Sequence, residues 1–582
     1  MRFEFTKEGL EASWKLFLVN ASVKGYQFSD KAIFTYGPAW FFTHHFYNPK
    51  LFWVFILSNA FTSVVISLFI IKTRWKLLSL IFLLWSFFIG QPEEFWPLFI
   101  VISLTRLFTV SKLSFPEVLL LLWFAFIGFS KFSYFILITP IIPSIDIVNI
   151  TERKYRLPIF SLVFVVCMLA AYIILGQNIL TLFTYLSNSV QIASGYSKTM
   201  GLGLEPQTIR HLLGFYGICS IIELIWQTKK EDKSSYRILF IGLAITWGIL
   251  MIFKMGYVRE DGHIFITQAI FALLFIWIIF LQPKVSILFR FVTLFLLFKL
   301  LNLYTLQQSV LKLNWQDNTK SLTFSKKSLD IQYDSVKSRI GINIPIPKTA
   351  TVDSYPWDLA ELILGGYNYY PRPIPQTYSA YTNKLQDINY THLSEGKSDY
   401  ILLKIMDIDG RYPTLLLGKS LETLYSNYDV TNNCILDNDT ALILKRRISP
   451  RKKIVLDSFK SEFSAGDWFI LPPQKTEFRE AKINFKPTLL GELKNFFLHQ
   501  DYAWIEVQTA SGEIKRFRFI PNVANNGFVL SPLLNSTKDY VQYDSTDNVK
   551  RIRVYSDNDD MFNHVINIET TDFDMQEREQ PK

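Results

Sequence analysis

An acidic residue near the start of the chain stands where a carboxylate could act as a base. Asp30 lies in a polar segment, residues 25–41, directly ahead of the first long apolar run. Tyr36 follows it and precedes Gly-Pro, a pair that favours a turn because proline restricts φ and glycine accepts unusual dihedral angles. A simple amphipathic segment beside a membrane could contain the same residues. A carboxylate next to a rigid turn at a membrane surface would also suit proton removal from a hydroxyl group.

A second polar segment, from Lys254 to His263, could bind the phosphate of a substrate. Arg259 can hold a phosphate through two parallel hydrogen bonds, with Lys254 or His263 as a second cation. Glu260 completes this charged loop, which could instead do no more than end two helices. Acidic side chains here and in other loops could orient sugar hydroxyl groups or a divalent cation; they are Glu93, Glu94, Glu205 and Asp261.

The candidate residues are separated by long apolar runs. Between residue 51 and about residue 303, these runs are broken only by short charged loops. A helix of about 20 residues rises about 1.5 Å per residue and crosses a hydrocarbon core about 30 Å thick. We predict an amphipathic helix at residues 4–24, followed by about ten membrane spans. The spans are residues 51–71, 77–92, 95–111, 114–130, 132–150, 157–176, 207–226, 237–256, 263–281 and 284–304.

Basic loops predict how these spans are oriented. Lysine and arginine cluster at residues 72–76, 153–156 and 229–237, and these clusters and Lys284 fall on one side of the predicted spans. The positive-inside rule makes that side cytoplasmic. The first 50 residues and everything after about residue 305 are then outside, together with the candidate site residues. Several acidic loops on that face favour a shared site, because ionisable groups at a membrane boundary are costly unless they are paired, solvated or used.

The polar C-terminal half is predicted to form two extracytoplasmic regions. Residues 306–450 mix strand and helix patterns and indicate an α/β domain. Residues 451–575 indicate a β-sandwich, followed by a tail at residues 576–582. Within the predicted sandwich, apolar residues alternate with arginine at 516–519 and 551–554, which is the period of a half-buried strand. The fold class is therefore a polytopic α-helical membrane protein with a C-terminal α/β and β-sandwich region.

A tyrosine-rich run in the α/β domain is a candidate for contact with an acceptor. Prolines at 371, 373 and 375 hold this run extended. Tyr378 and Tyr381 could then stack on a sugar ring. The same run could instead pack the soluble part against the membrane part.

Composition narrows the classes of function. The chain has 582 residues and a net charge of +10, but much of the basic excess lies in the predicted membrane loops, and no ordered nucleic-acid motif is present. The 3 cysteines make neither a disulfide framework nor a metal site. We expect a membrane partner, no nucleic acid, no resident metal and no certain cofactor, with a divalent cation as the one candidate.

Three motifs resemble those of a family of bacterial polytopic membrane proteins. They are Phe-Thr-Tyr-Gly-Pro at residues 34–38, Val-Arg-x-Asp-x-His at residues 258–263, and Pro-Arg-Pro-x-x-Gln-x-Tyr-x-Ala-Tyr-Thr at residues 371–382. The architecture of many spans, an acid in the first outer loop and a soluble C-terminal domain also resembles the GT-C superfamily. Members of that superfamily are glycosyltransferases that use a sugar linked to a polyprenyl phosphate.

The resemblance implies a membrane glycosyltransferase of the bacterial inner (cytoplasmic) membrane. It would transfer a sugar from a lipid-phosphate donor to an envelope glycan or other acceptor at the extracytoplasmic face. The first-loop acid is the usual base of the superfamily, and it corresponds to Asp30. GT-C proteins begin with a transmembrane helix ahead of this loop, so we expect an apolar segment in the reading frame upstream of Met1.

Two other classes of function remain open at this point. The chain could be a non-enzymatic scaffold or a component of a polysaccharide assembly or export system. It could also be a ligase or polymerase of lipid-linked glycans, which would use the same outward surface. An enzyme and a scaffold differ in how they tolerate the replacement of Asp30 by asparagine.

The basic loops generate a prediction about the C-terminus. A reporter enzyme that is active only outside the cytoplasm, fused after Lys582, should be active in whole cells. A second fusion, with the reporter placed in the basic loop at residues 153–156, should be inactive and serves as the control. Activity of a cytoplasm-only reporter after Lys582 would contradict the predicted orientation.

Overall fold

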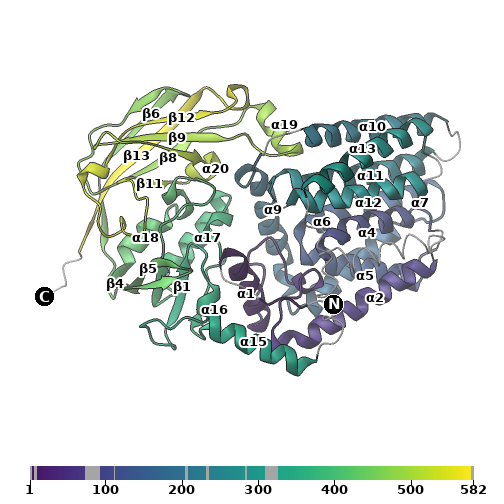
Figure 1. The fold of residues 1–582 in the computed structure, drawn as a ribbon, viewed down its shortest axis with the longest axis horizontal. Helices are drawn as coiled ribbons and strands as arrows, with labels where there is room; N and C mark the ends of the chain where they lie inside the picture. The colour runs from purple at the N-terminus through teal and green to yellow at the C-terminus, as the bar shows by residue number, and fades with distance from the viewer. Residues whose placement is uncertain are drawn as a thin grey trace. The chain divides into compact units, whose positions relative to one another are not determined.

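The computed structural model describes residues 3–5, 9–72, 92–110, 112–203, 208–230, 235–261, 263–281, 285–307 and 325–577. The chain divides into two compact units, and Figure 1 traces its course through both. The first unit contains Met1–Glu4, Thr35–Leu182 and Leu202–Asp330, and the second contains Phe5–Phe34, Phe183–Gly201 and Ile331–Lys582. The units are therefore discontinuous in sequence, and the predicted divisions at residues 50, 305 and 450 stay predictions.

The first unit is helical. Its helices are α2 (Phe52–Lys72), α4 (Pro92–Leu107), α5 (Phe115–Ser130), α6 (Phe132–Ile138), α7 (Ile141–Thr151), α8 (Ile159–Ile174), α10 (Thr208–Lys230), α11 (Ser235–Tyr257), α12 (His263–Leu281) and α13 (Ile287–Gln307). Two further helices, α9 (Leu182–Thr199) and α15 (Lys326–Ile340), begin in this unit and continue in the second.

Several of these helices are long and apolar enough to cross a membrane. Among the described residues there are four by length and composition, namely Pro49–Ile71, Phe132–Thr151, Ile209–Gln227 and Tyr236–Tyr257. A fifth results if Ile159–Ile174 and Ile179–Thr199, which meet at 117°, form one broken span. Exposed apolar side chains on α8, α10 and α13, such as Val166, Ile222 and Phe298, are typical of a lipid-facing surface. A multi-pass membrane protein is indicated, whereas the count of about ten spans remains a prediction.

Local sequence explains where some helices begin and end. Helix α5 begins with a capping box, in which Ser114 and Glu117 satisfy backbone N–H groups at its first turn. The predicted span at 132–150 is divided between α6 and α7 at Thr139–Pro140, because proline has no N–H group for a helical hydrogen bond. The predicted span at 77–92 lies almost entirely outside the described residues.

Contacts within the first unit group its loops into two sets. In one set, Arg237 forms an ion pair with Glu152, and the backbone N–H of Ser286 donates to Glu223 over 2.7 Å. In the other set, the backbone of Leu202 pairs with that of Arg259. Each of these contacts joins segments that the sequence predicts to lie on the same side of the membrane, and the predicted orientation stays a prediction.

The second unit begins with an α/β region. Its five-stranded sheet has the order β2-β1-β3-β5-β4, in which β1 is parallel to β2 and β3 and the other pairs are antiparallel. The strands are β1 (Thr351–Tyr355), β2 (Asn368–Tyr369), β3 (Tyr400–Leu403), β4 (Tyr428–Leu436) and β5 (Asp439–Arg446). The helices are α1 (Leu10–Val23), α16 (Ala360–Leu364), α17 (Asn383–Ser394) and α18 (Ser420–Asn427). Helix α1, predicted to be amphipathic, is buried along most of its length.

Two four-stranded antiparallel sheets follow, in the orders β10-β9-β12-β7 and β11-β8-β13-β6. Their strands are β6 (Lys452–Ser464), β7 (Trp468–Ile470), β8 (Phe478–Asn484), β9 (Ala503–Thr509), β10 (Ile514–Phe519), β11 (Phe528–Ser531), β12 (Val549–Ser556) and β13 (Val565–Gln576). Ile505 and Val554 of one sheet share a buried core with Ile483 and Ile568 of the other. Helices α19 (Leu489–Phe497) and α20 (Pro521–Ala524) connect strands of this region.

Buried arginines join the separate segments of the second unit. Arg411 donates to the carbonyl oxygen of Thr199 over 2.9 Å, and Arg518 donates to those of Thr199 and Gly201 over 3.1 and 2.7 Å. Both guanidinium groups are within 3.8 Å of Asp409. They therefore satisfy carbonyl groups at the end of α9 that have no partner within the helix. The alternation at residues 516–519 predicted that Arg518 is exposed. Arg518 is buried instead, because its guanidinium group binds the carbonyl groups at the end of α9.

Candidate functional site

The loop that carries Asp30 is fixed at both ends while the carboxylate itself is exposed. The backbone N–H of Ile33 donates to the carbonyl oxygen of Pro373 over 2.8 Å. Asn188 of α9 donates to the carbonyl oxygen of the buried Ser29 over 2.8 Å. The Ser29 hydroxyl donates to Asp30 Oδ1 over 3.1 Å. The structure thus presents the Asp30 carboxylate to solvent from a backbone that is held on both sides.

The two candidate tyrosines lie next to this loop, but one of them is enclosed. Tyr381 belongs to a buried cluster with Ile33 and Ile192. The side chain of Tyr381 packs directly on Gly195 of α9. Any larger residue at position 195 would place its Cβ 2.3 Å from the Cβ of Tyr381, so α9 requires glycine here. Tyr378 is partly exposed, and its hydroxyl donates to Gln376 over 2.7 Å. Tyr378 is therefore the more accessible of the two for stacking on a sugar.

The first unit holds the charged loop that was predicted to bind phosphate. Arg259 Nε donates to Asp261 Oδ2 over 2.6 Å, and Asp261 also contacts His263. Burial by itself would raise the pKa of Asp261, but the hydrogen bonds from His263 and Arg259 hold that pKa below its ordinary value. Glu260 is buried and pairs with Arg210 of α10 over 2.7 Å. Arg259, Asp261 and His263 form one contiguous group, whereas Glu260 has a structural partner.

Other predicted site residues have different surroundings. Tyr36 is buried, with Lys131 donating to its hydroxyl over 3.3 Å and the Lys131 ammonium 5.0 Å from the ring centre. Lys254 lies in the last turn of α11. Glu93 and Glu94 lie in the first turn of α4, and their side chains are outside the described part of the structure, as is all of Glu205.

The predicted residues thus form two groups in different units. Asp30, Tyr378 and Tyr381 belong to the second unit, whereas Tyr36 and the loop with Arg259 belong to the first. The sequence reasoning placed them on one face, and that convergence remains a prediction.

A third group of residues was missed by the sequence reasoning. Lys404 directly follows β3, and Asp358 follows β1, so both lie beyond the carboxyl ends of neighbouring parallel strands. Lys404 Nζ is 2.6 Å from Asp358 Oδ2, and both side chains are buried. The connections from these strands lead in opposite directions along the sheet, and the crevice at such a point commonly holds ligands in α/β proteins. A lysine after an apolar strand was the available sequence signal.

A further acid accompanies this buried pair. Glu361 lies in the first turn of α16, whose first N–H groups donate to Ser13 of α1. Neither carboxylate oxygen of Glu361 has a hydrogen-bond partner among the described residues. Burial raises its pKa to about 7, with Asp358 adding to the effect. Burial raises the pKa of Asp358 as well. Because α1 covers this end of α16, the group has the character of a buried charge cluster more than of an open active site.

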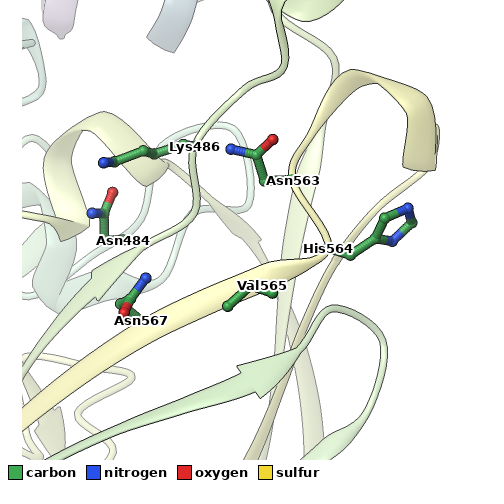
Figure 2. Close-up of a pocket in the computed structure, with 6 residues that line it drawn as sticks. All are labelled: Asn484, Lys486, Asn563, His564, Val565 and Asn567. Carbon is green, nitrogen blue, oxygen red and sulfur yellow. The ribbon is translucent and has the colours of Figure 1, made fainter.

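A shallow polar depression lies at one end of the two-sheet region. It has a volume of about 450 Å³ and is lined by Asn484, Lys486, Asn563, His564, Val565 and Asn567. Figure 2 shows the His564 ring pointing away from the three asparagines. Amide groups and an ammonium group offer hydrogen bonds to hydroxyl or phosphate oxygens.

In the described part of the chain, no group of three or more histidine, cysteine, aspartate or glutamate side chains could hold a metal ion. The divalent cation proposed for Glu93, Glu94, Glu205 and Asp261 stays a prediction, because three of these side chains lie outside that part.

Comparisons of the chain with protein-family models, curated proteins and solved structures found no match. A function for the chain therefore has to be argued from the chemistry of its residues.

The buried Glu361 generates a prediction about pH. A carboxyl whose pKa is raised on folding stabilises the fold below its unfolded pKa and loses that stabilisation as pH rises through the folded pKa. As the pH rises from the ordinary pKa of 4.5 to the raised pKa of about 7, ionisation of Glu361 should lower the free energy of unfolding of the second unit by up to about 3 kcal/mol. The Glu361→Gln variant should not show this loss. Its midpoint temperature of unfolding should exceed that of the wild type near pH 8, and the two midpoints should approach each other near pH 4.5.

Thermal unfolding of the purified full chain across this pH range is the measurement. Glu513→Gln, on an exposed turn between β9 and β10, is the matched control and should behave as the wild type. A parallel pH dependence in Glu361→Gln and in the wild type would show that Glu361 is not the group responsible.

Proposed function

We propose that the chain is a GT-C-like membrane glycosyltransferase. It transfers a sugar from a lipid-phosphate donor to an envelope glycan or other acceptor at the extracytoplasmic face of the bacterial inner membrane. Asp30 removes the proton from the acceptor hydroxyl as the new glycosidic bond forms and the donor phosphate leaves.

The observation that carries this proposal is the presentation of Asp30. Hydrogen bonds at Ser29 and Ile33 fix the backbone on both sides of an exposed carboxylate. A base must be held within hydrogen-bond reach of the proton that it removes, and general-base catalysis contributes about 10²–10⁴-fold to a rate. Tyr378, partly exposed near this loop, supplies an aromatic face for the acceptor sugar.

Arg259 is the proposed partner of the donor phosphate. In the free protein its guanidinium pairs with Asp261, which keeps the side chain oriented. The phosphodiester of a lipid-phosphate-linked sugar carries one negative charge and has two oxygens that can accept parallel hydrogen bonds from one guanidinium. A donor that approaches along the membrane surface would therefore compete for Arg259, with His263 nearby as a second hydrogen-bonding group.

The apolar helices support a membrane-bound donor. A polyprenyl chain is confined to the bilayer, so an enzyme that uses it benefits from being anchored there. The proposed orientation, with the C-terminal half outside the cytoplasm, rests on the positive-inside rule.

A non-enzymatic scaffold of a polysaccharide assembly is the second candidate. The enclosure of Tyr381 favours it, because that ring packs within the chain and is not offered to a sugar. A ligase or polymerase of lipid-linked glycans would share the Asp30 surface with the proposed transferase, and the nature of the acceptor would distinguish the two.

Asp30→Asn tests the proposed base. The substitution keeps the size of the side chain but removes the basic carboxylate, so turnover should fall about 10²-fold or more with donor binding unchanged. The measurement is glycan transfer by membranes that contain equal amounts of each variant. Asp457→Asn, an exposed aspartate on β6, is the matched control and should retain full activity. Full activity in Asp30→Asn would exclude a catalytic base at this position.

Arg259→Ala tests the phosphate contact. Because the guanidinium would bind the phosphate before as well as during reaction, the variant should lose donor affinity and turnover together. Donor binding to the purified protein is measured directly, with Arg156→Ala as the control, since Arg156 is exposed and belongs to a loop predicted to lie on the other side. Donor affinity equal to that of the wild type would leave the loop only its role of joining α11 to α12.

A further inference from the structure

Helix α19 has its apolar face turned to the outside. Its exposed residues are Leu489, Leu490, Leu493, Phe496 and Phe497, with exposed fractions of 80%, 53%, 50%, 56% and 53%. The face turned to the protein carries Gly491 and Asn495, which are buried. A surface helix of a soluble domain normally has the opposite arrangement, with its apolar stripe against the core. These five side chains are called the α19 face below. Their exposure predicts that an apolar surface other than water contacts them.

The chain holds α19 rigidly in this orientation. Thr488 caps the helix by accepting from the backbone N–H of Gly491, and its hydroxyl donates to the carbonyl oxygen of Asp560 over 2.7 Å. A Cβ on Gly491 would lie 2.2 Å from the carbonyl oxygen of Met561, so the helix is seated directly on the neighbouring backbone. Rotation of α19 to hide its apolar residues would break these contacts. The α19 face is thus a fixed feature of the surface.

The contacts of α19 also place it against α9, which is distant in sequence and belongs to a candidate membrane span. Glu492 forms an ion pair with Lys198 of α9 over 2.7 Å, and the N–H of Gln500 donates to the carbonyl oxygen of Ser197 over 3.1 Å. Helix α9 follows the apolar helix α8 as the second half of a bent pair. The end of α9 at Thr199 is followed after a short connection by the apolar helix α10, which begins at Thr208. Because α9 is itself the second half of a candidate broken span, a bilayer that holds α9 is within reach of α19.

We propose that the α19 face rests on the surface of a lipid bilayer that also holds α9. The apolar side chains enter the boundary between headgroups and acyl chains, as in other interfacial helices. The charges beside this face are already neutralised, Glu492 by Lys198 and Lys494 by Asp501 over 2.5 Å, so that no unpaired charge is carried into the boundary. Lys486 is exposed just ahead of α19 and lines the polar depression, where it can meet a lipid phosphate. This contact anchors the two-sheet region to the membrane surface independently of any enzymatic activity.

Depth-dependent quenching tests this proposal on the full chain. The three cysteines are replaced by serine, and a fluorophore is attached at Leu493→Cys in nanodiscs that hold one copy of the chain each. The discs contain phosphatidylcholine and phosphatidylglycerol with a nitroxide near the headgroup. We expect several-fold greater quenching at Leu493→Cys than at Glu513→Cys, an exposed control position in the same region.

A second variant separates lipid contact from incidental proximity. Leu493→Glu, with the fluorophore at Phe497→Cys, should lower the lipid quenching to the control value while the unfolding profile stays unchanged, because both positions are exposed. Strong quenching of the Leu493→Cys label by iodide, with none by the nitroxide lipid, would overturn the proposal in favour of a water-exposed face. Shielding from both quenchers would also overturn it, because another protein segment would then cover the face.

Discussion

The second unit depends on buried guanidinium groups that bind backbone carbonyl oxygens. Arg411 and Arg518 hold the end of α9 against the sheets, although α9 is separated from them by some 200 to 300 residues of sequence. Arg372 does the same within the α/β region, where it binds Asp353 and carbonyl groups of Ser354 and Pro356 with no exposed surface. A buried charge is tolerated only when its hydrogen bonds are satisfied, so removal of one of these arginines would leave carbonyl groups unpaired in the interior. These hydrogen bonds connect segments that are distant in sequence, and the segments therefore form one compact unit.

The same constraint changes how the motifs are understood. The run at residues 371–382 contains the tyrosines predicted to contact an acceptor, and Arg372 within this run is enclosed and organises the surrounding loops. The carbonyl of Pro373 in turn holds Ile33, and through it the loop with Asp30. A motif can therefore support a site without contacting a substrate. This gives the run at 371–382 a structural reason to accompany the first-loop acid, whether or not its tyrosines meet a sugar.

Two kinds of charged group contrast within the molecule. Asp30 is exposed and accepts a hydrogen bond from Ser29, and the ion pair of Arg259 with Asp261 is partly exposed, so both places can be reached from solvent. Asp358 and Glu361 are buried beside a single lysine, which raises the pKa of both carboxyl groups and makes the fold sensitive to pH. A perturbed pKa often marks a functional site, but here the perturbed groups are covered by α1. Accessibility, more than the size of a pKa shift, therefore identifies the residues proposed to act on a substrate.

The sequence by itself determined the local elements of this protein, and the tertiary structure decided what they contact. Helix α12 occupies residues 263–281 as predicted, since a continuous apolar run with no proline or glycine has few alternatives to a helix. The alternation at 551–554 likewise predicted β12, with Ile552 and Val554 inside. The burial of Arg518, the pairing of Asp358 with Lys404 and the outward apolar face of α19 were not predictable, although each lies in or beside an element with a clear pattern. Each depends on groups more than thirty residues away in the chain or on the side from which a neighbour packs, and local periodicity carries no information about such partners.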